Sequence, residues 1–317
     1  MKDNLRFKDL VNKKVNLSIG TFDAFHRGHI RILDILKEYS KKDHVMSAVL
    51  TFKKKPRSLL IKSDEGILTP VAKRKRMFEK QGVDLLIMIP FNKRLALMGP
   101  DYFIDHLARL FTINRIIIGE DFRFGRGKAG DAGLLRKMSE RYGFKTMVIK
   151  NLLYKNKKIG SSRIKEYIHQ GRLMEASKLL GRYYDLEGKV IKGEGLGKKI
   201  GYPTINIKPL FPDQIRVSPG VYVTLTEITG GRPYWGLTYT GRKYVGKKRK
   251  NPVIETYLFN FRENTGIKKV DIFFIKRLRK EFKFSNLNDL VKQIENDVIK
   301  GMEVKHELEK GRQTIFD

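Results

Sequence analysis

The sequence predicts an α/β domain built on a parallel sheet, followed by a smaller antiparallel β domain that ends in a helix. In the first half of the chain, short apolar segments alternate with amphipathic helical segments, which is the rhythm of repeated β-α-β units. Near residue 181 the helical pattern stops, and short alternating segments separated by glycine, proline and charged turns replace it. The 317 residues are enough for two such domains.

The first strand is expected at residues 15–19, where apolar and polar side chains alternate. Apolar side chains then recur at helical spacing as far as Leu36, so a helix follows the strand. Further strands, with helices between them, are expected at 45–51, 85–89, 113–118 and 145–149. Helices should cover both faces of this parallel sheet, and such sheets bind ligands at the carboxyl ends of their strands.

The second domain begins where helical periodicity ends. The last helical patterns lie at 164–168 and 173–180, and Gly181 is suited to end the second of these helices. We therefore expect a first domain over 1–182 and a second over 183–317. The second domain should form a small closed barrel with a terminal helix, from segments at 188–191, 220–223, 234–240, 253–261 and about 287–298.

Composition excludes several classes of protein. Hydrophobic residues make up 41% of the chain, which is typical of a globular protein. Because the chain has no cysteine, disulfides, thiolate chemistry and zinc-finger sites are excluded. No leader-like segment opens the sequence, and no apolar run approaches membrane-spanning length. We expect a cytoplasmic protein with no membrane partner.

The chain is strongly basic, with 66 Lys and Arg against 34 Asp and Glu and a net charge of +32. Nucleic acid is one candidate partner for such a charge. However, the basic residues are spread over the chain, and the densest run, 247–250, is expected to be an exposed hairpin loop. We therefore expect no specific nucleic-acid recognition, and part of the charge can steer small polyanions. A nucleic-acid-binding protein on the same scaffold is the alternative from another functional class.

Residues 20–29, Gly-Thr-Phe-Asp-Ala-Phe-His-Arg-Gly-His, lie between the first strand and its helix. Amide groups at a helix start attract anions. His26 and His29 can both face a phosphate chain if Gly28 lets the backbone approach closely, and Gly20 clears room on the strand side. A lone histidine would more often be a packing residue, but two of the six histidines lie here three residues apart. The turn therefore suits transfer of a nucleotidyl group.

This stretch closely resembles the H-x-G-H motif of the nucleotidylyltransferase superfamily, and the preceding Gly-x-Phe-Asp resembles its flavin branch. The resemblance implies a Rossmann-like domain in which His26 and His29 are catalytic. It also implies an ATP-binding role for part of the turn, at Gly20, Thr21, Phe22, Asp23 and Gly28.

The segment Gly160-Ser-Ser-Arg163 introduces a helix, and taken alone such a segment is usually only a helix cap. Behind an H-x-G-H turn it resembles the second ATP-binding motif of the same superfamily, which closes on the triphosphate. The resemblance implies ATP-binding roles for Ser161, Ser162 and Arg163.

The segment Gly119-Glu-Asp-Phe-Arg-Phe-Gly125 follows an expected strand. It resembles the flavin-family Gly-x-Asp-Phe-x-Phe-Gly segment that borders the FMN site. The resemblance implies that Asp121, Phe122 and Phe124 bind flavin. A buried aromatic turn is the alternative for each phenylalanine.

In the second domain, Gly195-Leu-Gly-Lys-Lys-Ile-Gly-Tyr-Pro-Thr-Ile-Asn206 combines glycines that let a loop wrap phosphates with hard oxygen donors suited to Mg²⁺. It resembles the Pro-Thr-x-Asn motif of riboflavin kinase, although a simple turn is the alternative for its Pro-Thr pair. The resemblance implies that ATP is bound by Gly195, Gly197, Lys198 and Gly201, and that Mg²⁺ is bound by Thr204 and Asn206.

Glu255 lies within residues 253–261, and its neighbours at a spacing of two are apolar. Such a carboxylate lies either at the solvent-exposed end of a strand or in a position where it takes part in catalysis. The riboflavin kinase resemblance places the catalytic glutamate here, as the base that accepts the proton of the riboflavin hydroxyl.

Taken together, the resemblance covers nearly the whole chain and is to the bacterial bifunctional riboflavin kinase/FAD synthetases. It implies that ATP phosphorylates riboflavin to FMN, and that a second ATP adenylylates FMN to FAD, both with Mg²⁺. Tyr244, Val245 and Asn260 depart from the usual kinase pattern. A monofunctional FAD synthetase with a degenerate kinase domain is therefore an alternative. Self-association is left open by the sequence.

Overall fold

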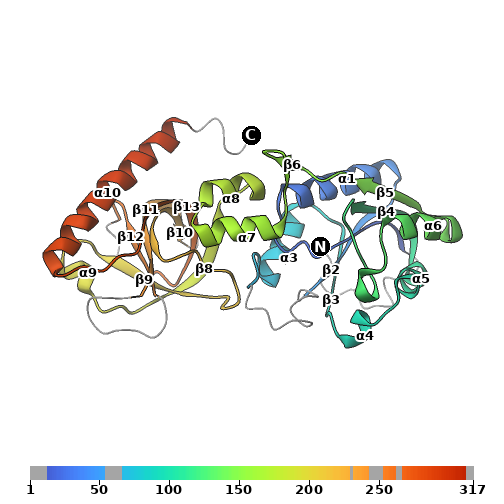
Figure 1. The fold of residues 1–317 in the computed structure, drawn as a ribbon, viewed down its shortest axis with the longest axis horizontal. Helices are drawn as coiled ribbons and strands as arrows, with labels where there is room; N and C mark the ends of the chain where they lie inside the picture. Colours follow the sequence, from blue (N-terminus) through green and yellow to red (C-terminus); the bar gives the residue numbers. More distant parts are fainter. Residues whose placement is uncertain (1–12, 54–65, 229–230, 243–252, 262–265, 312–317) are drawn as a thin grey trace. The chain divides into compact units, whose positions relative to one another are not determined.

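The computed structural model describes residues 13–53, 66–228, 231–242, 253–261 and 266–311 (Figure 1). Its contacts divide the chain into two compact units, Met1–Ser161 and Ser162–Asp317. The first unit contains a five-stranded sheet, and the second contains a closed barrel followed by a long helix. The predicted fold class is therefore confirmed.

The sheet of the first unit is parallel throughout, in the order β3-β2-β1-β4-β5. Its strands are β1 (Lys13–Ile19), β2 (Met46–Phe52), β3 (Leu85–Ile89), β4 (Phe111–Gly119) and β5 (Lys145–Ile149). The chain builds outward from β1 to β3 and then returns to the other side of β1 with β4. Such a reversal opens a crevice at the carboxyl ends of the two central strands, here β1 and β4.

Helices cover both faces of this sheet. They are α1 (Arg27–Lys42), α3 (Val71–Lys80), α4 (Lys93–Ala96), α5 (Pro100–Leu110) and α6 (Ala132–Tyr142). On one face, α1 and α3 pack on Val49 and Ile117 of the sheet. On the other face, α5 and α6 pack on a set that includes Leu17 and Ile116. The carboxyl edge is thus held between two apolar layers.

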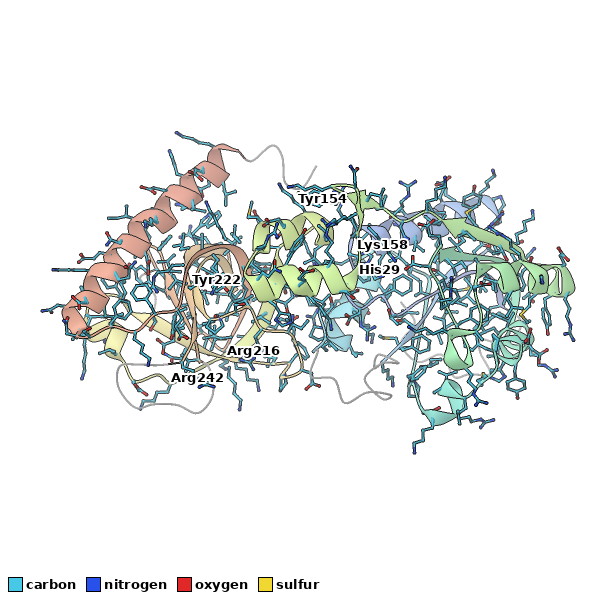
Figure 2. The ribbon with its side chains drawn as sticks, in the orientation of Figure 1. His29, Tyr154, Lys158, Arg216, Tyr222 and Arg242 are labelled. Carbon is cyan, nitrogen blue, oxygen red and sulfur yellow. The ribbon has the colours of Figure 1, made fainter. Side chains whose placement is uncertain are left out.

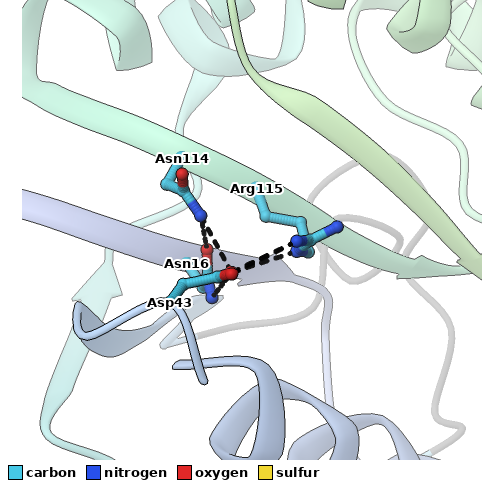
Figure 3. A network of polar contacts seen from close by, with 4 residues as sticks. All are labelled: Asn16, Asp43, Asn114 and Arg115. Carbon is cyan, nitrogen blue, oxygen red and sulfur yellow. Dashed lines mark hydrogen bonds and ion pairs between the residues drawn. The ribbon is translucent and has the colours of Figure 1, made fainter. Parts of the chain in front are cut away.

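A polar network joins β1, β4 and the end of α1 at the amino end of the sheet (Figure 3). The amide nitrogens of Asn16 and Asn114 each donate to Asp43 Oδ2 over 2.9 Å, and Arg115 Nη2 lies 3.3 Å from the same oxygen. The hydrogen bond from Asn16, aided by the charge of Arg115, holds the pKa of Asp43 below its ordinary value. This network lies at the end of the sheet opposite the predicted nucleotide turn.

A short hairpin of β6 (Leu153–Tyr154) and β7 (Lys157–Lys158) follows the sheet, and the sequence did not predict it. Its two central residues, Lys155 and Asn156, have φ angles of 51° and 55°. This is the conformation of a two-residue hairpin turn with both central residues left-handed.

The barrel of the second unit has the order β10-β11-β12-β9-β8-β13, with antiparallel pairs and with β13 closing onto β10. Its strands are β8 (Tyr184–Ile191), β9 (Thr204–Pro209), β10 (Gly220–Ile228), β11 (Pro233–Gly241), β12 (Val253–Leu258) and β13 (Lys269–Lys280). The sequence did not predict β9 or β13 as separate strands. Strand β9 continues directly from a glycine-rich loop, and in β13 four basic residues interrupt the apolar alternation after Ile275.

Two helices precede the barrel, α7 (Ser161–Gln170) and α8 (Leu173–Leu180). Gly181 ends α8 in a left-handed conformation, with φ 75° and its amide bonded to Ser177, as predicted. Because α8 packs against β8 and β13, the contact-based division falls near residue 161. The expected boundary at 182/183 places α7 and α8 in the first domain, whereas the division by contacts groups them with the barrel. The expected boundary stays a prediction.

The final helix, α10 (Leu287–Lys310), begins at the cap residue Asn286 and extends well beyond the predicted end near 298. Figure 1 shows it running along the outside of the barrel. It packs on an apolar patch of β10 and β11 that includes Val221, Val223 and Leu237. The predicted loop at 247–250, together with Tyr244 and Val245, lies outside the described residues. No described helix is both long and apolar enough to span a membrane.

Candidate active sites

The turn after β1 brings the two predicted histidines together. His26 caps α1, and its Nδ1 accepts the backbone N–H of His29 over 3.2 Å. The two rings stack with centroids 3.7 Å apart and an angle of 15° between their planes. His26 is buried and His29 is half-buried at the start of α1, where Figure 2 labels it. The pair lies at the carboxyl end of β1, one of the two strands that flank the crevice.

Two glycines fit closely beside this histidine pair. A Cβ atom on Gly28 would lie 3.1 Å from Cε1 of His26, and one on Gly20 would lie 2.9 Å from the Phe22 ring. Phe22 and Phe25 have φ angles of 45° and 48°, a left-handed conformation that is unfavourable for aromatic residues. Such strain persists only where surrounding structure holds it, and it concentrates at functional sites.

Arg74 of α3 holds the same turn, and sequence analysis did not identify it. Its Nη1 donates to the carbonyl oxygen of Thr21 over 2.7 Å. Asp23 of the turn is buried, and its charge acts on Arg74. Burial lowers the pKa of Arg74, and the Asp23 carboxylate partly offsets this shift. One signal was present in the sequence, because Arg74 lies four residues before the buried Phe78 and so on the inner face of α3.

The predicted flavin loop follows β4, the other strand beside the crevice. Its Asp121 is exposed and forms an ion pair with Lys158 of the β6–β7 hairpin, labelled in Figure 2. Burial acts to raise the pKa of Asp121, but hydrogen bonds from Lys158 and Asn151 outweigh it and lower the pKa below its ordinary value. Lys158 is thus a second residue that sequence analysis missed. The two partners are 37 residues apart, and no local pattern links them.

The two phenylalanines of this loop differ in their surroundings. Their rings stack with centroids 5.4 Å apart. Phe124 is buried in the core beneath α5, and its backbone forms a two-bond bridge with Gly130. Phe122 is half-buried at the edge of that core. Phe124 therefore packs as the buried aromatic turn that was the alternative reading, and the flavin-binding roles of Asp121, Phe122 and Phe124 stay predictions.

The predicted second ATP motif lies at the start of α7. Ser161 is the first residue of the helix, and Ser162 is exposed. The Arg163 guanidinium donates to the hydroxyl of Tyr167 over 2.9 Å and lies 5.3 Å from the centroid of that ring. The contact-based division of the chain falls within this motif. Its role in binding ATP stays a prediction.

In the second unit, strand register brings together the residues predicted for the kinase. Asn206 of β9 stands opposite Glu255 of β12, and Thr204 stands opposite Tyr257. Residues two apart on a strand share a face, so all four side chains lie on one face of the barrel wall. The same four residues line one cavity. The sequence placed these residues in separate motifs, and the register joins them.

The glycine-rich loop packs directly on these donors. A Cβ atom on Gly193 would lie 2.1 Å from Nδ2 of Asn206, and one on Gly197 would lie 3.1 Å from Oγ1 of Thr204. Gly195 and Gly201 have φ angles of 74° and 85°, which favour glycine. Both Gly195 and Gly197 line the cavity, whereas Lys198, exposed within the short helix α9 (Leu196–Lys199), and Gly201 are not among its lining residues.

The rest of the cavity combines an apolar wall with a charged pair. The wall comes from barrel and α10 residues and from the segment between them: Val221, Leu237, Phe282, Phe284, Leu290 and Ile294. Arg279 Nε lies 2.9 Å from Asp297 Oδ2, and Gln293 also donates to that carboxylate. The Arg279 guanidinium lies 4.4 Å from the centroid of the Phe282 ring. A cavity with these walls suits a flat, largely apolar ring with a few polar groups.

The donors of this cavity suit Mg²⁺ that arrives with ATP. Among the described residues, no group of three or more His, Asp and Glu side chains could hold a metal. Mg²⁺ usually keeps several waters and binds through few protein oxygens plus substrate phosphates. The hydroxyl of Thr204 and the amide of Asn206, beside the Glu255 carboxylate, fit this mode of binding. Asn260, which departs from the usual aspartate, has φ 55°, a conformation that asparagine tolerates.

Comparisons with known proteins match two separate parts of the chain to two families. Residues 8–163 match the family model of FAD synthetase, and residues 180–304 match that of riboflavin kinase. The first match includes the histidine turn, the loop after β4 and the Ser-Ser-Arg motif. The second includes the glycine-rich loop and Glu255.

Relatives that match along most of the chain are described as bifunctional. A bifunctional riboflavin kinase/FMN adenylyltransferase of Buchnera aphidicola (subspecies Schizaphis graminum) is 34% identical over 293 residues, which cover 91% of this chain and 93% of that protein. The protein of the same description from Escherichia coli K12 is 30% identical, with 90% and 91% covered. A crystal structure described as a macrolide-efflux protein from Streptococcus pneumoniae matches with a TM-score of 0.80 and 26% identity, covering 92% of this chain and 95% of that one. The chain therefore belongs to the family of bifunctional riboflavin kinase/FMN adenylyltransferases, with an FAD synthetase domain followed by a riboflavin kinase domain.

Proposed function

We propose that the chain converts riboflavin to FMN and then FMN to FAD, each step with one ATP. In the first step the riboflavin hydroxyl oxygen attacks the γ-phosphorus and ADP leaves. In the second, an FMN phosphate oxygen attacks the α-phosphorus and pyrophosphate leaves. The observation that carries the proposal is that each unit holds its own phosphate-directed set of side chains, stacked histidines in one and a Thr-Asn-Glu face in the other.

For adenylyl transfer, His26 and His29 act as donors to the reacting phosphates. Because Nδ1 of His26 accepts a hydrogen bond, the tautomer that carries a proton on Nε2 is favoured, and this proton can be donated to a phosphate oxygen. Charge develops on the α-phosphate and on the departing pyrophosphate, so donors fixed in advance stabilise the transition state most. The turn residues Gly20 to Asp23, Gly28, and the Ser161–Arg163 motif are assigned to ATP, and Asp121, Phe122 and Phe124 to the flavin.

For phosphorylation, Glu255 is the base that takes the proton of the riboflavin hydroxyl as its oxygen attacks. Thr204 and Asn206 would hold Mg²⁺ with the ATP phosphates, and the metal would neutralise charge on those phosphates. The glycine-rich loop with Lys198 is assigned to ATP. The apolar wall below α10 would take the flavin ring and exclude water from it.

We assign adenylyl transfer to the domain over 1–182 and phosphorylation to the domain over 183–317, in a cytoplasmic enzyme. The presence of Thr204, Asn206 and Glu255 on one face favours an active kinase over a degenerate one. The net charge of +32 is the feature that favours a nucleic-acid-binding function, whereas the stacked histidines and the Thr-Asn-Glu face favour the enzyme.

Incubation of the purified protein with riboflavin, ATP and Mg²⁺, followed by chromatography of the flavins, tests the proposal. We expect FMN first and FAD later. Formation of FAD from supplied FMN, without FMN from riboflavin, would select the monofunctional alternative. The absence of both products would refute both assignments.

A further inference from the structure

Arg74 is a buried cation that the two reactions do not use directly. It is 5% exposed, and its described hydrogen bonds go to backbone carbonyls. Nη1 donates to Thr21 over 2.7 Å, and Nη2 donates to Phe52 over 2.9 Å and to Lys53 over 3.1 Å. Burial of a charge is costly unless the charge is hydrogen-bonded, so a buried arginine in a surface-forming helix calls for a specific reason.

The three carbonyls belong to two different segments at the carboxyl edge of the sheet. Thr21 lies in the turn after β1, whereas Phe52 ends β2 and Lys53 follows it. Thr51 of β2 adds a second link between the strand and the turn, because its Oγ1 also donates a hydrogen bond to the Thr21 carbonyl over 3.1 Å. The guanidinium thus fastens the turn to the end of the neighbouring strand.

The fastened carbonyl lies where the turn is strained. Thr21 immediately precedes Phe22, which has φ 45°, and the Phe22 ring lies 5.1 Å from the ring of His29. A strained conformation needs surrounding contacts to keep it populated. The bonds to the Thr21 carbonyl are contacts of that kind, and they act on the segment that leads to both histidines.

We infer that Arg74 is a positioning residue for adenylyl transfer, which fixes the turn so that His26 and His29 meet the phosphates in one geometry. The inference rests on the proposed adenylyltransferase activity. It requires the forked guanidinium, because one group must reach carbonyls on two segments at once. A lysine ammonium carries the same charge but lacks this planar fork.

The experiment compares three variants, Arg74→Met, Arg74→Lys and Arg115→Met. Arg115 serves as the matched control, because it is a largely buried arginine of strand β4 that bonds Asp43 at the amino end of the sheet, away from the turn. For each variant, kcat and KM are measured for FMN adenylylation and for riboflavin phosphorylation, together with the melting temperature.

We expect Arg74→Met to lower kcat for adenylylation by about a hundredfold, as a misplacement of about 1 Å can do, with a smaller change in KM for ATP and FMN. Arg74→Lys should restore only part of this kcat. Phosphorylation should keep the parent rate in both. Arg115→Met should lower the melting temperature and leave both kcat values unchanged.

A folded Arg74→Met variant with the parent adenylylation kcat would overturn the inference, and so would an equal loss of kcat in Arg115→Met. If Arg74→Met does not fold, Arg74→Lys decides by the same criterion, with the parent kcat counting against the inference. Absence of FAD formation in the parent protein would instead refute the proposed function, so the two failures are distinguishable.

Discussion

Asn206 of β9 stands directly opposite Glu255 of β12, and this cross-strand pair joins the predicted metal site to the predicted base. The two residues are far apart in the sequence, and only the barrel register makes them neighbours. If the pair works as proposed, each residue can be altered with an effect confined to riboflavin phosphorylation.

Glu255→Gln should therefore lower the rate of FMN formation by about a hundredfold, in line with loss of a general base. The amide keeps the shape of the side chain but cannot take the hydroxyl proton. FAD formation from added FMN should be unchanged. A folded Gln variant that phosphorylates riboflavin at the parent rate would show that the base lies elsewhere.

Gly193→Ala tests the placement of Asn206. The added Cβ would lie 2.1 Å from Nδ2 of Asn206, so the amide must move away. We expect FMN formation to fall by about tenfold or more, because small displacements of positioned groups are costly. Gly99→Ala is the matched control, since its Cβ meets nothing within 4 Å. Equal rates in the two variants would contradict a role for Asn206.

The network around Asp43 should make stability depend on pH. Its folded-state pKa lies below the ordinary 3.8, so the carboxylate stabilises the fold above that value, and this contribution is lost as the pH falls through the folded pKa. Asp43→Asn should reduce the free energy of unfolding by about 1 to 2 kcal/mol near pH 7, and the difference from the parent should shrink below about pH 4.

Chemical denaturation at several pH values measures this difference. Asp34→Asn is the control, because Asp34 lies on α1, the helix that Asp43 caps, and its ion pair among the described residues is an exposed one with Lys37. A difference between parent and Asp43→Asn that stays constant down to pH 3 would argue against the network as the source.

The net charge of +32 gives a fourth expectation. Binding to oligonucleotides should be weak and should disappear near physiological salt, because it would come only from release of counterions. Titration with duplex and single-stranded oligonucleotides at two salt concentrations decides the matter. Tight, sequence-dependent binding at the higher salt would support the nucleic-acid-binding alternative.

Much of the fold was predictable because its signals are local. The parallel strands are apolar segments bounded by turns, and Gly181 ends its helix as a glycine in a left-handed cap does. By contrast, β13 was missed because four basic residues interrupt its apolar alternation after Ile275. The end of α10 was placed too early, since Met302, Val304 and Leu308 beyond residue 298 still pack on the barrel. Gly301, a residue typical of helix ends, lies inside this helix, where it faces Leu237 and Phe259 at close range.

The candidate sites divide in the same way. The histidine turn and the glycine-rich loop are continuous motifs, so the sequence alone located them. Arg74 and Lys158 contact residues 53 and 37 positions away, and the fold alone brings such partners together. Phe124 shows the reverse case, in which a motif residue packs into the core.

The central claim is that one chain holds two separate active sites, and His29→Ala tests it most directly. In a single assay with riboflavin, ATP and Mg²⁺, the variant should form FMN at the parent rate. FAD formation should fall by about a hundredfold or more, because an electrostatic donor to the transition state is lost. Equal loss of both products in a variant with the parent melting temperature would contradict the account.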